Sequence, residues 1–227
     1  MKSKLLVCAA MFAALAATSP ANAGIIINGT DYAVGSGTTL SFNGFSDGGL
    51  VPGLTADLTL TLTSIVGNTF NVAYSLLNTS TQTGARVVSF GFNVDPNVSG
   101  AAATGSFDTA DLNVNYPVGF GTVEVCAYDG PGGTCTGNGN GATIGGGALT
   151  GNLALSFSSP HTSITLSNFV DRYQAFNYNG TNSAIGTPTT PLPEPSTWAM
   201  MLIGFGAIGA FMRRGKAADV KGRVSFA

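Results

Sequence analysis

Two cysteines, Cys126 and Cys135, are the residues with the clearest potential for chemistry. They flank a glycine-rich loop that lets the chain turn back on itself. In an exported protein such a pair favours a disulfide, because exported compartments are oxidising. A metal site needs more ligands than this neighbourhood offers, and His161 is distant in the sequence. A free catalytic thiol would lack an obvious base. We therefore predict a disulfide between Cys126 and Cys135.

Other reactive patterns in the sequence are weaker. Asp108 and Asp111 could share a cation, but no calcium-binding loop motif surrounds them. His161 is the only histidine, and no serine-histidine-aspartate arrangement is evident near it. The glycine clusters at 137–141 and 145–147 precede no helix or lysine that would bind phosphate. We predict no metal site, no cofactor and no enzymatic activity.

Five tyrosines leave a carbohydrate-binding role open. They fall at predicted turns or strand ends, where rings could either stack on sugars or border a β-core. They are Tyr32, Tyr116, Tyr128, Tyr173 and Tyr178.

A segment near the C-terminus has the properties of a sorting element. Pro193, Glu194 and Pro195 place an acid on extended backbone, since proline fixes φ and cannot donate a helical hydrogen bond. The apolar run 198–212 follows and favours a helix. Its fifteen residues would span about 22 Å, less than the ~30 Å hydrocarbon core of a membrane. A soluble core helix is the alternative, but the run has no polar face.

The residues at the two ends of this run favour a short transmembrane helix. Trp198 suits one membrane interface, while Arg213 and Arg214 mark a cytoplasmic flank and can extend toward headgroups. Residues 217–227 would then form a cytoplasmic tail.

The N-terminus, residues 1–23, predicts a signal peptide. Lys2 and Lys4 are followed by an apolar stretch over 5–17, and a small-residue cleavage site ends at Ala23. The Sec machinery and signal peptidase are the partners that this implies. The two ends together place the intervening body outside the cytoplasm.

The body is acidic and has few charges. Nine acidic residues lie between 24 and 192, against only Arg86 and Arg172 as basic residues. Nucleic-acid binding requires a basic surface, so that class of function is excluded. The scarcity of lysine and glutamate also argues against a solvated helical domain and favours strands with tight turns.

Alternating apolar and polar residues predict the strands. Residues 58–63 and 70–76 predict a hairpin with a turn at Gly67-Asn68. We expect one all-β domain over 24–179, an antiparallel β-sandwich of jelly-roll type. A stalk rich in threonine, serine and proline would follow over 180–192. Further strands are expected at 38–45, 88–94, 122–127, 149–157 and 163–169.

The motif Pro193-Glu194-Pro195, the apolar run and the basic pair resemble the PEP-CTERM sorting signal over 193–216. Such signals occur in Gram-negative bacteria that make exopolysaccharide. The resemblance implies recognition by exosortase, a membrane-embedded transpeptidase-like cysteine enzyme, with cleavage near the motif and release to the cell surface.

The body more weakly resembles the cistern family of PEP-CTERM proteins. The resemblance lies in 88–92, 123–126, 130–135 and 172–174. It implies no known activity.

These features predict a non-catalytic surface or extracellular-matrix protein associated with exopolysaccharide in a biofilm. It would be held transiently in the inner membrane before exosortase releases it. A carbohydrate-binding module at the cell surface is the alternative.

Overall fold

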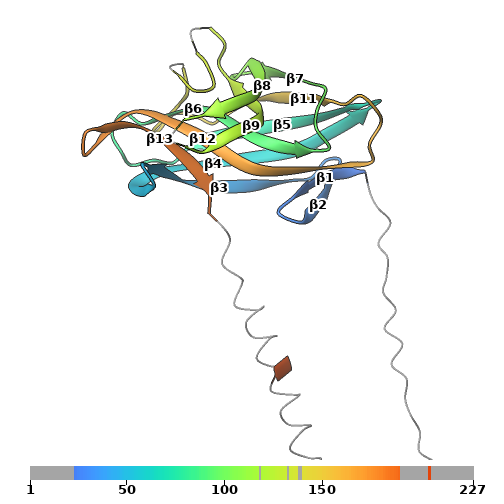
Figure 1. Cartoon of the computed structure of the whole chain (residues 1–227), viewed down its shortest axis with the longest axis horizontal. Coiled ribbons are helices and arrows are strands. Elements are labelled where there is room, and N and C mark those ends of the chain that lie inside the picture. The colour runs from blue at the N-terminus through green and yellow to red at the C-terminus, as the bar shows by residue number, and fades with distance from the viewer. Residues whose placement is uncertain (1–22, 118, 132, 138–139, 190–203, 206–227) are drawn as a thin grey trace, which may run out of the picture. The chain divides into compact units, whose positions relative to one another are not determined.

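A computed structural model describes residues 23–117, 119–131, 133–137, 140–189 and 204–205. The chain divides into two units, Met1–Pro188 and Thr189–Ala227. The first unit is built from thirteen strands (Figure 1). They are β1 Gly24–Ile27, β2 Thr30–Ala33, β3 Gly37–Ser46, β4 Gly49–Val66, β5 Thr69–Asn78, β6 Arg86–Asp95, β7 Gly100–Gly105, β8 Thr109–Tyr116, β9 Gly121–Tyr128, β10 Ala142–Thr143, β11 Leu149–Ser156, β12 Ser163–Tyr178 and β13 Thr181–Pro188.

The predicted all-β antiparallel body is confirmed, and its layers are parts of one continuous sheet. The strands follow the order β7-β11-β5-β4-β3-β13-β12-β6-β9-β8. Short β1, β2 and β10 pair beside this path, and β1 is parallel to β12. The two end strands, β7 and β8, lie next to each other, so the sheet is nearly closed (Figure 1).

The interior of this folded sheet is packed with apolar side chains. Tyr74 on β5 contacts Phe90 on β6 with ring centroids 5.3 Å apart, although β4, β3, β13 and β12 separate these strands in the sheet. Phe92 packs on Phe169 at 5.6 Å in the same way. Alternation along each strand supplies this core, because every second side chain points inward. On β4, for example, Leu58, Leu60 and Leu62 are fully buried.

The predicted β4–β5 hairpin is confirmed. Val66 pairs with Thr69, and the two-residue connection is Gly67-Asn68. Gly67 has φ of +57°, which glycine adopts without the steric penalty of a side chain. All seven segments predicted as strands lie within or overlap a strand of the sheet, the last of them extended to Tyr178.

The stalk predicted over 180–192 is wrong for residues 181–188. They form β13, which lies between β3 and β12 and hydrogen-bonds to both. Ala184 and Ile185 are buried, which a solvated stalk would not provide. The dipeptide Asn179-Gly180 favours a tight hairpin turn and could have been recognised in the sequence. In the structure these two residues have φ of +50° and +83° and connect β12 to β13.

Several predicted segments lie outside the described residues. These are the signal peptide up to residue 22, the remaining stalk from 190 to 192, most of the predicted helix and the tail. Gly204 and Phe205, the described part of the predicted helix, have helical backbone. Within the described part of the chain, no helix combines the length and the apolar character that crossing a membrane requires.

Candidate functional site

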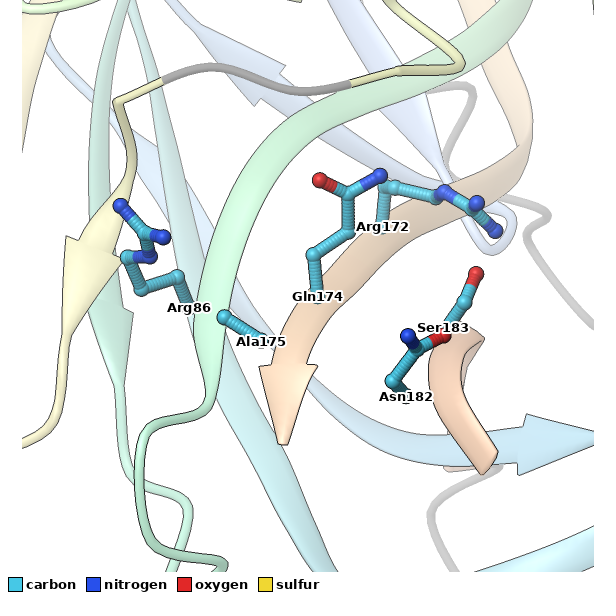
Figure 2. A pocket seen from close by; sticks show the side chains of 6 residues that line it. All are labelled: Arg86, Arg172, Gln174, Ala175, Asn182 and Ser183. Carbon is cyan, nitrogen blue, oxygen red and sulfur yellow. The ribbon is translucent and has the colours of Figure 1, made fainter. Parts of the chain in front are cut away.

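Among the described residues, a polar hollow on the outer face of β6, β12 and β13 is a candidate binding site. Its volume is about 380 Å³, within the range of small-molecule pockets. No residue of this set was predicted as a site. Its lining residues are Arg86, Arg172, Gln174, Ala175, Asn182 and Ser183 (Figure 2).

The register of three strands brings these polar side chains together. Gln174 on β12 lies opposite Arg86 on β6 and opposite Ser183 on β13. Arg172 precedes Gln174 by two residues and therefore shares its face of the sheet. Figure 2 shows the two arginines on either side of Gln174, with Asn182 and Ser183 across from it. β6 is distant in the sequence from β12 and β13, so local pattern does not reveal the site.

A bulge in β12 adds to the shape of the hollow. The pairing between β12 and β13 shifts register between Gln174 and Tyr178. Ala175 within this bulge has φ of +64°, an uncommon conformation for a residue with a side chain. The carbonyl oxygen of Ala175 lies close to Gly84, where a β-carbon would be only 2.6 Å away. Bulges bend a strand and often occur beside binding sites.

Arg172 is the most unusual member of the set. Its residue is 6% exposed, and its Nε and Nη1 atoms have no hydrogen-bond partner among the described residues. Burial lowers the pKa of the Arg172 guanidinium, while the nearby Tyr116 hydroxyl acts in the opposite direction. An arginine remains charged in proteins, so this site holds a buried positive charge with unused donors.

A hydrogen-bonded cluster supports the outer face beside Arg172. Ser89, which lies opposite Arg172 on β6, donates to the Cys135 carbonyl at 2.7 Å. The Ser89 hydroxyl also lies 2.9 Å from the Tyr116 hydroxyl. Because the serine proton is used by the Cys135 carbonyl, Tyr116 is the donor in this second bond.

Cys126 and Cys135 form a disulfide in the structure, with Cα atoms 6.1 Å apart. Both cysteines are buried, and they pack with Tyr116, Val170 and Ile185 in a small cluster on the outer face. The disulfide thereby holds the loop after β9 against β12, the strand that carries Arg172. It is a structural element next to the hollow.

The inner face of the same strand carries a buried ionisable group, the Asp171 carboxyl. Asp171 is fully buried and lies opposite Gly186 of β13. Burial raises the pKa of the Asp171 carboxyl to about 8, although the Tyr173 hydroxyl and the Gly186 N–H oppose this shift. A β-carbon on Gly186 would collide with Asp171, so glycine is required at this position. Asp171 does not reach the hollow, because adjacent residues of a strand point to opposite faces.

The two aspartates considered for a cation have structural partners instead. Asp108 accepts the Gly130 N–H at 2.8 Å and the Thr109 hydroxyl at 3.0 Å, and the Gly130 bond in particular lowers its pKa. Asp111 accepts the Tyr128 hydroxyl at 3.0 Å. In the part of the chain that the structure describes, no three histidine, cysteine or acidic residues gather in a metal-binding group.

The tyrosines do not form a sugar-stacking surface. Tyr116, Tyr128 and Tyr173 are buried, and Tyr32 and Tyr178 pack partly against the main core. The positions of these tyrosines are therefore explained by packing in and around the core. His161 lies 3.4 Å from the Ser159 hydroxyl and packs edge-on against Phe157, which gives it a loop-packing role.

The predicted sorting and cleavage residues can be placed only in part. Ala23 is exposed, and the next residue, Gly24, is already buried in β1. The sorting motif at Pro193, Glu194 and Pro195 and the helix boundaries at Trp198, Arg213 and Arg214 lie outside the described residues.

The comparison with protein families matches the C-terminal segment. Residues 191–216 match the model of the PEP-CTERM protein-sorting motif. The chain therefore carries a PEP-CTERM sorting motif, which indicates an exported protein that is sorted by exosortase. No curated protein and no solved structure matches the chain. The resemblance of the body to the cistern family is unsupported by these comparisons.

Proposed function

We propose that this protein is a non-catalytic surface or extracellular-matrix component that works beside exopolysaccharide after exosortase releases it. The observation that carries the proposal is the sorting motif at 191–216, which follows an all-β body ending at Pro188. The body holds a polar hollow lined by arginine, amide and hydroxyl groups. Such groups bind ligands through hydrogen bonds and charge.

Processing at the motif would leave the body intact. All thirteen strands end before residue 189, so cleavage near Pro193 removes no hydrogen bond of the sheet. Sorting and folding would then be separate events. The mature protein would carry the complete hollow to the cell surface.

The test of the sorting step is the intact mass of the protein released by the producing bacterium. The expected mass corresponds to a chain that begins at Gly24, ends near Pro193 and is two hydrogens lighter through one disulfide. Glu194→Gln should accumulate in the membrane with its C-terminal segment attached. A matched control, Asp219→Asn in the predicted tail, should be released normally. Normal release of Glu194→Gln would contradict exosortase processing at this motif.

Binding to exopolysaccharide is tested separately. Released protein should sediment with the producer's own polysaccharide, and heat-denatured protein serves as the control for non-specific trapping. Equal recovery from cultures with and without the polysaccharide would contradict the matrix role.

A further inference from the structure

We propose that the hollow between Arg86 and Arg172 binds the carboxylate of an acidic saccharide. Arg86 and Arg172 are the only lysine or arginine residues among the described residues, and both line the same hollow. In an acidic body, two isolated cations that share one hollow mark a site for an anion.

Arg172 is buried. Its side chain is more than nine-tenths buried, and two of its donor atoms have no partner among the described residues. A buried charge without a partner is destabilising, and the charge of an anion bound in the hollow would offset the cost of burying the Arg172 guanidinium. The planar guanidinium suits a carboxylate because it can donate two parallel hydrogen bonds.

The remaining lining residues indicate what carries the carboxylate. Gln174, Asn182 and Ser183 supply uncharged donors and acceptors, and Ala175 is the only apolar side chain in the lining. Amides and hydroxyls match the hydroxyl groups of a sugar ring, while an apolar ligand would find little surface here. This saccharide assignment rests on the proposed function, whereas the anion site itself depends only on the geometry of the hollow.

The test is calorimetric titration of the purified full-length chain in detergent, so that it does not depend on sorting. The probes are an oligogalacturonate, a neutral galactose oligomer of equal length, sodium acetate and a short polyglutamate. The oligogalacturonate should bind, and its affinity should fall as salt increases. Arg86→Gln should weaken binding at least about tenfold, the effect of losing a charge-assisted hydrogen bond.

Matched variants separate the site from general charge. Asn97→Asp changes the net charge by the same amount as Arg86→Gln but lies beyond the opposite end of β6, so its binding should match the wild type. Arg172→Lys keeps the positive charge but loses the planar guanidinium with its paired hydrogen-bond donors, so this variant should also bind the oligogalacturonate weakly. Thermal unfolding of each variant reports whether it remains folded. Because Arg86 is not fully buried, Arg86→Gln provides the test even if the Arg172 variant unfolds.

Several results would overturn the proposal. One is a folded wild-type chain that binds none of the anionic probes, and another is unchanged oligogalacturonate binding in Arg86→Gln. Equal affinity for acetate would reduce the site to a simple anion pocket, and tighter binding of polyglutamate would assign it to acidic peptides. A failure here with correct release in the sorting experiment would reject the saccharide site alone.

Discussion

The hydroxyl of Tyr74 makes two hydrogen bonds to the backbone of Phe107: it accepts the N–H at 2.7 Å and donates to the carbonyl at 2.9 Å. Tyr74 lies in the middle of β5, and Phe107 lies in the short link between β7 and β8. Those two strands are the ends of the sheet. One buried hydroxyl therefore fixes the link at which the sheet nearly closes.

The first prediction concerns this contact. Tyr74→Phe keeps the ring packing against Phe90 but leaves the Phe107 N–H buried without a partner, so the free energy of unfolding should fall by about 1–3 kcal/mol. Denaturant unfolding measures the loss. Tyr178→Phe, at a partly buried site, should change stability by less than about 0.5 kcal/mol. Equal effects of the two variants would contradict the importance of the Phe107 contact.

The second prediction is a fall in stability with rising pH that depends on Asp171. Its pKa is raised from the ordinary 3.8 to about 8 in the folded protein. Between these values the unfolded chain releases the proton while the folded chain keeps it. The contribution of Asp171 to the free energy of unfolding is therefore greatest below about pH 4. It falls by up to about 1.4 kcal/mol per pH unit until the folded carboxyl ionises near pH 8.

Denaturant unfolding between pH 4 and pH 8 measures this slope. Asp171→Asn removes the titrating proton and should make the dependence on pH flatter. Asp47→Asn is the matched control, because Asp47 lies in an exposed turn. It should retain the wild-type slope. A wild-type slope in Asp171→Asn would show that another group is responsible.

The third prediction concerns the disulfide. It closes a loop between residues nine apart, so its removal should lower the free energy of unfolding by about 2–3 kcal/mol through the greater freedom of the unfolded chain. Unfolding of wild-type protein with and without reductant measures the difference. The double variant Cys126→Ser with Cys135→Ser should not respond to reductant. A wild-type protein with two free thiols and unchanged stability would contradict the disulfide.

The fourth prediction separates a strand from a stalk at residues 181–188. A chain that ends at Gly180 loses β13, exposes the edges of β3 and β12, and uncovers contacts of Ala184 and Ile185. It should lack a cooperative thermal transition. A chain that ends at Thr189 keeps every strand and should unfold cooperatively. Identical transitions of the two chains would restore the stalk interpretation.

Local pattern predicted the strands whose faces differ most in polarity. The alternation at 58–63 places leucines inward and threonines outward, and β4 has this arrangement. β8 was missed although Leu112, Val114 and Tyr116 alternate with polar residues along it, and most of this strand is exposed or half-buried in the structure. β13 was missed because its threonines and proline suggested a solvated segment. The Asn179-Gly180 turn was the stronger indicator there.

The hollow depends on long-range pairing that no single segment contains. The sequence shows that Arg86 and Arg172 are the only basic residues of the body, which is the one available signal. Their proximity follows from the register between β6 and β12, and the bulge at Ala175 contributes to the shape of the hollow. The Ser89–Tyr116 contact beside Arg172 likewise joins residues of β6 and β8 that are distant in the sequence.

The end strands also bear on self-association. An unpaired strand edge can template the addition of another chain, and long, flat, apolar edges carry the greatest risk of amyloid-like polymerisation. Here β7 has only six residues, and β8 carries the charge of Asp111 and a left-handed residue at Asn113. Both features discourage edge-to-edge growth. In the proposed matrix role, cohesion would then come from what the side chains of this protein bind and not from strand pairing between molecules.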